Sequence, residues 1–170
     1  MYKAAKHPRF DLFWTTLKDC GALTAIGLQL SPTFADNIKT SQLDDIMRML
    51  SAFWHQDDIS GFLKLSPPSN IADSMKIIHD QKTVLLLDVL PPEVDVLAAL
   101  KRLDPFRRLS RALTIINSMP NSANKPTWLK LCDTMNTLDI SAVIQGSKPH
   151  ERQNLIEQAR LKAIHTVLNR

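Results

Sequence analysis

Five basic side chains stand close together in the middle of the chain, where they could bind an anion. They lie within eleven residues, with Asp104 the one acidic residue among them: Lys101, Arg102, Arg107, Arg108 and Arg111. On a helix opened by Pro105, the last three would span about 100° of arc. The other side would be apolar, with Phe106, Leu109, Leu113 and Ile116. Such a face can neutralise phosphates or dock an acidic protein surface, although a charge run is also typical of a solvated helix face.

An apolar run just upstream contains an aspartate. It reads Thr83-Val-Leu-Leu-Leu-Asp88-Val-Leu-Pro-Pro-Glu-Val-Asp95 and leads into Val96-Leu-Ala-Ala-Leu-Lys-Arg-Leu. This pattern resembles the strand, phospho-accepting aspartate and following helix of a bacterial response-regulator receiver domain. The resemblance implies that Asp88 is a nucleophile at a strand end, with acidic residues nearby that hold Mg²⁺.

The remaining parts of the receiver pattern are not where that family places them. The upstream acidic pair would follow a first strand, but Asp44-Asp45 fall inside an expected amphipathic helix. The later lysine-proline signature would follow a last strand, and Lys148-Pro149 have only residues 140–144 as a possible strand before them. We therefore treat the resemblance as coincidental and expect Asp88 at a turn or cap between two apolar segments.

The sequence lacks the spacing patterns of common metal and catalytic sites. The five histidines have neither an HxxxH pair nor a cysteine pair beside them: His7, His55, His79, His150 and His165. No GxSxG, P-loop or GxGxxG motif occurs. The sequence therefore predicts no catalytic residue, no cofactor and no metal ion.

Composition limits the class of protein. The chain has 170 residues, 44% of them hydrophobic, with 21 Lys and Arg against 17 Asp and Glu. A length and balance of this kind predict one folded domain spanning residues 1–170. Cys20 and Cys132 stand far apart, which favours a reducing cytoplasm. No apolar run approaches the ~18 residues of a membrane span, and the start of the chain does not resemble a secretory signal peptide.

The apolar residues favour helices. Leu occurs 24 times and Ile 13 times, whereas Val occurs six times and Tyr once. Because leucine is a strong helix former and strands favour β-branched and aromatic residues, we predict an all-α fold, an irregular bundle of six to eight helices. Residues Thr83–Leu90 suit a buried strand or a buried helix equally.

Prolines and apolar periodicity divide the chain into helix-sized pieces. The first runs over about 9–28, and the second starts near an N-cap at Ser41 and carries an apolar stripe to Trp54. Helical spacing places Trp14, Phe53 and Trp54 in the core, and Trp128 fits the same pattern. The terminal helix, begun by Ser147 and Pro149, is apolar over so wide an arc that it must be covered on two sides.

These features predict a non-enzymatic interaction module: an adaptor, a chaperone-like protein or a regulatory subunit that docks a protein partner with an acidic surface. The partner-binding residues would be those of the basic cluster at 101–111. One alternative is a nucleic-acid-binding helical protein in which the cluster acts together with Lys148, Arg152, Arg160 and Lys162. A duplex would require the two groups to form one continuous basic track. Another alternative is an enzyme with an unrecognised helical active site.

Overall fold

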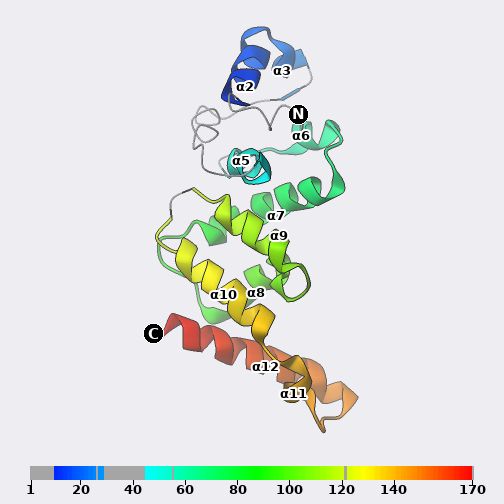
Figure 1. Ribbon diagram of the computed structural model, residues 1–170, viewed down its shortest axis with the longest axis vertical. Coiled ribbons are helices and arrows are strands. Elements are labelled where there is room, and N and C mark those ends of the chain that lie inside the picture. The colour runs from blue at the N-terminus through cyan, green and yellow to red at the C-terminus, as the bar shows by residue number, and fades with distance from the viewer. Residues whose placement is uncertain (1–9, 26, 29–44, 55, 121, 170) are drawn as a thin grey trace. The chain divides into compact units, whose positions relative to one another are not determined.

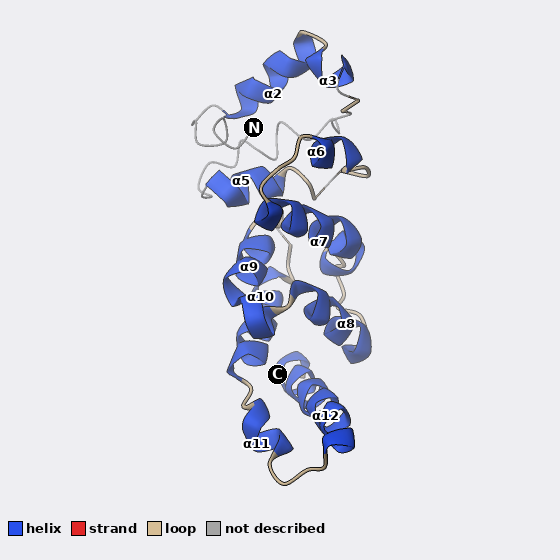
Figure 2. Ribbon diagram, turned by 90° about the vertical axis from the view of Figure 1, so that its right-hand side faces the viewer, coloured by secondary structure: helices blue, strands red, loops and turns tan. Residues whose placement is uncertain are grey.

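The computed structural model describes residues 10–25, 27–28, 45–54, 56–120 and 122–169. Every regular element in these ranges is an α-helix, as Figures 1 and 2 show, so the predicted all-α fold is confirmed. The ten described helices exceed the expected six to eight because several are single turns of four or five residues. None of the described helices is long and apolar enough to cross a membrane.

The chain divides into two compact units. Unit 1 comprises residues 1–82 and 117–121, and unit 2 comprises residues 83–116 and 122–170. That residues 1–170 fold as a single domain stays a prediction.

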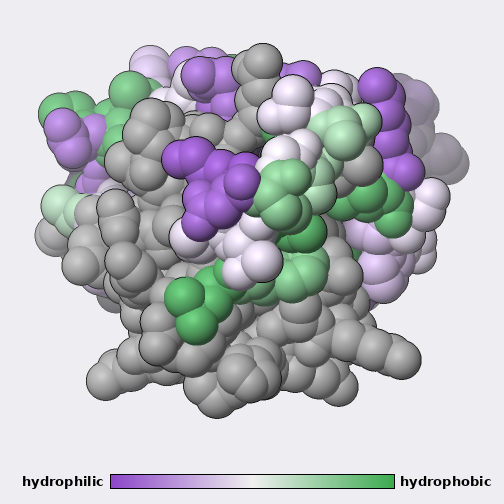
Figure 3. Space-filling view, turned by 90° about the horizontal axis from the view of Figure 1, so that it is seen from above, coloured by the Kyte–Doolittle hydropathy of each residue, from purple (hydrophilic) through white to green (hydrophobic). Residues whose placement is uncertain are grey.

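The first two described helices of unit 1 are shorter than the sequence predicts. The expected helix over 9–28 is instead α2 (Phe10–Asp19) followed by α3 (Ala22–Ala25). The break falls at Gly21, whose φ of 72° lies in the left-handed region, where glycine has no Cβ to clash. On the face drawn in Figure 3, hydrophobic and hydrophilic side chains of the described residues are intermingled.

The core of unit 1 is aromatic. It contains Trp14 from α2 and Phe62 from α6 (Ser60–Lys64), whose rings meet edge to face. Phe53 also packs edge to face on Phe62, with 4.6 Å between the ring centroids. The core positions predicted for Trp14, Phe53 and Trp54 are confirmed, because each side chain is buried.

The boundaries of the second expected helix differ from the structure. Helix α5 spans Asp45–Ser51, so Phe53 and Trp54 lie in a turn after the helix and not on its stripe. Ser41, the expected N-cap, lies outside the described residues. The indole of Trp54 donates a buried hydrogen bond of 3.0 Å to the hydroxyl of Ser118, which joins this turn to residues 117–121 of the same unit.

The ambiguous segment Thr83–Leu90 contains no strand. Helix α7 (Ser69–Leu85) runs through its first three residues, and the remainder is a loop in which Asp88 is exposed. The side-chain amide of Asn124 donates to the backbone carbonyls of Leu87 and Asp88, at 2.7 and 2.9 Å, and fixes this loop. Residues 140–144, the other candidate strand, form α11 (Ile140–Ile144), so neither strand of the receiver resemblance exists.

Unit 2 contains the longest described helix, α12 (Pro149–Leu168). It packs against α8 (Glu93–Leu103), α10 (Lys125–Thr137) and α11. These contacts cover the wide apolar arc of α12 only in part, because Ile164 is fully buried but Leu155, Ile156 and Leu161 are half-buried. Trp128 of α10 is buried, as its helical position predicts.

Candidate functional site

A tight turn between α8 and α9 (Pro105–Asn117) joins the two halves of the basic cluster. Asp104 closes α8 in the left-handed conformation, with φ 56° and ψ 50°, and its N–H donates to the carbonyl of Leu100. Pro105 then takes the first position of α9, where its missing N–H costs nothing. The last turn of α8, with Lys101 and Arg102, is therefore joined through Asp104 to the first turn of α9.

The arginines of α9 do not form the single face that a regular helix would give. Arg108 has φ −134° and ψ 52°, so the helix is kinked at that residue. Arg107 and Arg108 are exposed, but the side chain of Arg111 is only 17% exposed. Its guanidinium donates to the backbone carbonyl of Leu103 at 3.3 Å. The prediction that Arg107, Arg108 and Arg111 share one face of a regular helix is thus corrected, since α9 is kinked at Arg108 and Arg111 is partly a structural residue.

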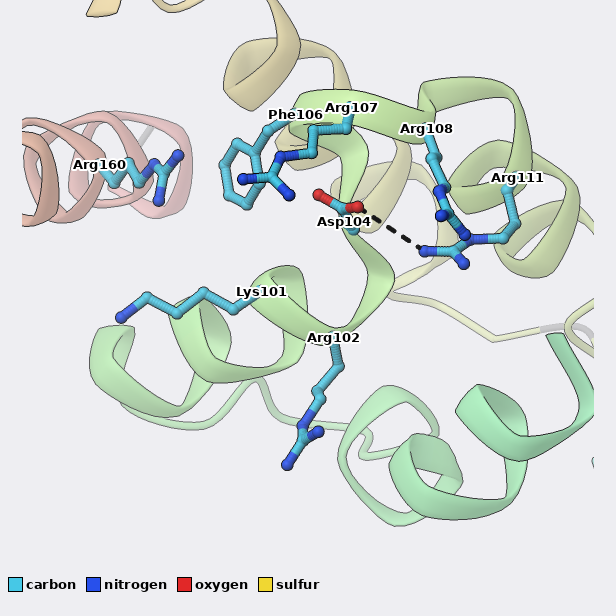
Figure 4. A pocket seen from close by; sticks show the side chains of 8 residues that line it. All are labelled: Lys101, Arg102, Asp104, Phe106, Arg107, Arg108, Arg111 and Arg160. Carbon is cyan, nitrogen blue, oxygen red and sulfur yellow. Dashed lines mark ion pairs between the residues drawn. The ribbon is translucent and has the colours of Figure 1, made fainter. Parts of the chain in front are cut away.

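Instead, the cluster surrounds an open hollow of about 490 Å³ in unit 2. Its walls include all five residues of the predicted cluster and Arg160 from α12, together with Asp104 and Phe106 (Figure 4). In Figure 4, Arg107, Arg108 and Arg111 gather around Asp104, whereas Lys101 and Arg102 extend away from it. Three helices therefore contribute cations to one concave site.

The charges of the hollow are strongly unequal. Six cationic side chains line it with one carboxylate, that of Asp104, which lies 4.0 Å from the guanidinium of Arg111. Lys101 pairs with Glu157 of α12, with 2.8 Å between Nζ and Oε1. In the described part of the chain, the side chains of Arg102, Arg107 and Arg108 have no ion pair. The hollow consequently carries a surplus of positive charge that an anion could neutralise.

Phe106 was not among the site residues predicted from the sequence, and Arg160 was named only in the nucleic-acid alternative. The guanidinium carbon of Arg160 lies over the Phe106 ring, 3.8 Å from its centroid. Phe106 was expected on the apolar side of its helix, away from the arginines, and it instead lines the hollow. A cation flanked by Ala159 and Leu161 on an otherwise apolar arc is the one sequence signal that could have indicated Arg160.

The electrostatic environment of Arg160 is unfavourable for its charge. Burial lowers the pKa of its guanidinium, Glu157 and Asp104 act in the opposite direction, and the nearby charge of Arg107 lowers the pKa again. Its buried Nε–H has no hydrogen-bond acceptor among the described residues, and the same is true of Arg111. Unpaired buried donors raise the free energy of a folded protein.

The basic residues of α12 do not all join this hollow. Lys162 follows Arg160 by two residues and so points about 200° away around the helix axis. Arg152 precedes Arg160 by eight residues, or roughly 12 Å along the axis, and Lys148 comes before the helix begins. Of the four residues in the nucleic-acid alternative, Arg160 lines the hollow and the other three do not.

The other candidate groups lie elsewhere. His79 is half-buried, His150 and His165 are exposed, and the Nδ1 atom of His165 lies 2.6 Å from a carboxylate oxygen of Glu93. His7 and His55 are outside the described residues. Within the ranges that the structure describes, no group of three or more histidine, cysteine, aspartate or glutamate side chains could hold a metal ion.

Comparisons of this chain with protein-family models, curated proteins and solved structures find no significant match. The chemistry of the hollow is therefore the basis on which a function is proposed.

Proposed function

We propose that this chain is a helical interaction module that docks an acidic segment of a protein partner in the hollow lined by α8, α9 and α12. The observation that carries the proposal is the convergence of six cationic side chains from three helices around a single carboxylate. Opposite charges on two surfaces steer their encounter and select partners. A partner segment with several carboxylates would match this charge distribution.

The shape of the site favours a local acidic segment over a nucleic-acid duplex. A duplex presents phosphates along its whole length and needs a continuous basic track. Here the cations surround one hollow, and Lys162 points to the other side of α12. An adaptor or regulatory subunit needs only such a compact docking site.

We also propose a cytoplasmic location, which the free thiols of Cys20 and Cys132 support, since reducing compartments keep cysteines unpaired.

The test measures binding of a fluorescein-labelled oligoglutamate peptide by fluorescence anisotropy. The double variant Arg107→Gln, Arg108→Gln removes two exposed charges of the hollow and should weaken binding more than about tenfold. The control variant Arg152→Gln, Lys162→Gln removes the same charge outside the hollow and should bind nearly as the unmodified chain does. Raising the salt concentration should weaken binding of the unmodified chain, because salt screens exposed charges.

Two results would contradict the proposal. If both double variants bind the peptide equally well, the hollow is not the docking site. If labelled duplex DNA binds more tightly than the peptide, and the control variant weakens that binding, the basic residues of α12 act in a nucleic-acid track instead.

A further inference from the structure

We propose that the preferred occupant of the hollow is a phosphorylated serine or threonine in the partner's segment. This inference rests on the proposed docking function and specifies the group that the hollow recognises. The relevant side chains are Arg107 and Arg108 on α9 and Arg160 on α12, which approach one hollow from two helices (Figure 4).

The arrangement of the guanidinium groups favours a phosphate over a carboxylate. A carboxylate is planar, with two acceptor oxygens that accept hydrogen bonds mostly in that plane. A phosphate monoester has three acceptor oxygens in a tetrahedral arrangement, so it can accept hydrogen bonds from guanidinium groups that arrive from different directions. Arg107, Arg108 and Arg160 belong to elements with different directions, because α9 is kinked at Arg108 and α12 is a separate helix.

The charge of a phosphate also suits the hollow better. Near neutral pH a phosphorylated serine carries a charge of about −1.5 to −2, against −1 for a carboxylate. Asp104 is the one acidic residue of the lining, and its carboxylate is oriented towards Arg111. Arg107 and Arg108 have no ion pair within the described residues, so their charges are available to a dianion.

Two of the guanidinium groups that line the hollow, those of Arg111 and Arg160, are partly buried. The Nε–H groups of Arg111 and Arg160 are buried and have no acceptor in the described part of the chain. Stacking on Phe106 holds the guanidinium of Arg160 in place without supplying an acceptor.

The test compares labelled peptides that differ at one position. One carries a central phosphoserine in a neutral flanking sequence, a second carries an unmodified serine, and a third carries two adjacent glutamates, which match the charge of the phosphate. At about pH 7.5 the phosphoserine peptide should bind more than about tenfold more tightly than the diglutamate peptide.

Two further measurements separate recognition of phosphate from general attraction of charge. Lowering the pH to about 5.5 should weaken phosphoserine binding roughly fourfold, because the second pKa of the phosphate is near 6. The diglutamate peptide should change little, since glutamate titrates near 4.3 and no histidine lines the hollow. Arg160→Lys keeps the charge but removes the planar fork, so it should weaken binding of the phosphoserine peptide by a larger factor than binding of the diglutamate peptide.

Three other outcomes of these binding measurements would contradict one or both proposals. Equal binding of the phosphoserine and diglutamate peptides would overturn the phosphate inference and leave acidic docking standing. If neither these peptides nor oligoglutamate bind, both the docking function and the phosphate inference are overturned. Single-stranded DNA that binds more tightly than the phosphoserine peptide, and loses binding in the Arg107→Gln, Arg108→Gln variant, would overturn the assignment to a phosphorylated protein segment.

Discussion

The guanidinium of Arg160 is centred 3.8 Å from the middle of the Phe106 ring. This contact joins the last helix of unit 2 to the first turn of α9, two elements that are more than fifty residues apart in the chain. It also places the cation of α12 near Arg107, so the wall that α12 contributes to the hollow is present only when α12 is packed in place.

The contact predicts an energetic coupling between the two residues. Phe106→Leu and Arg160→Gln should each lower the free energy of unfolding. The double variant should lower it by less than the sum of the two single decreases. The expected coupling is about 0.5–1 kcal/mol, typical of a cation over an aromatic ring at a partly exposed site. Urea denaturation of the four proteins measures it. Strict additivity would mean that the stacked geometry contributes nothing to stability.

The three arginines of α9 should differ in their effect on stability. Arg111→Gln removes the hydrogen bond to the Leu103 carbonyl and should lower the free energy of unfolding by about 1 kcal/mol. Arg107→Gln and Arg108→Gln remove exposed charges and should each change it by less than about 0.5 kcal/mol. Urea denaturation of the single variants is the measurement. Equal losses at all three positions would contradict this division between a structural arginine and two binding arginines.

The buried hydrogen bond of unit 1 should be important for stability. Ser118→Ala leaves the indole N–H of Trp54 without its acceptor in a fully buried position. The free energy of unfolding should fall by about 1–3 kcal/mol, the cost of an unsatisfied buried donor. Thermal and urea unfolding measure this loss, and Ser141→Ala, at an exposed position, is the matched control. A loss no larger than that of the control would show that the bond adds nothing.

Cys132 predicts a dependence of stability on alkaline pH. Burial raises the pKa of its thiol from 9.0 to about 12. Between these values the unfolded chain loses the thiol proton while the folded chain retains it, so stability falls as the pH rises above about 9. The Cys132→Ala variant lacks this contribution, and its unfolding free energy should fall less steeply, by up to roughly 1.4 kcal/mol per pH unit. Parallel curves for the two proteins from pH 9 upward would contradict the burial of this thiol.

Local sequence signals predicted much of the fold. Leucine-rich periodicity and the positions of proline correctly indicated an all-α chain and the starts of α8, α9 and α12. The sequence did not indicate that α5 ends before Phe53, because a buried aromatic residue satisfies the helical pattern whether it lies in a helix or in a turn. Thr83–Leu90 stayed ambiguous for the same reason, since apolar residues alone do not distinguish a helix end from a strand.

The candidate site was only partly predictable. The sequence brings Lys101, Arg102, Arg107, Arg108 and Arg111 to notice because they are neighbours in the chain. The position of Arg160 at the hollow depends on how α12 packs against the other helices. This packing involves residues far apart in the chain, so a local sequence pattern does not predict it. Helix α9 is kinked at Arg108, so the geometry of a regular helix misplaced Phe106 and Arg111.

The central claim is that the hollow, and not the basic surface in general, receives the anionic segment. The most direct measurement is an NMR titration of the ¹⁵N-labelled chain with the phosphoserine and oligoglutamate peptides, followed at the arginine side-chain Nε–Hε signals. We expect the signals of Arg107, Arg108 and Arg160 to shift in a saturable manner, while that of Arg152, outside the hollow, stays in place. Shifts that are equal at Arg152 and at the hollow, or that occur at Arg152 alone, would contradict the account.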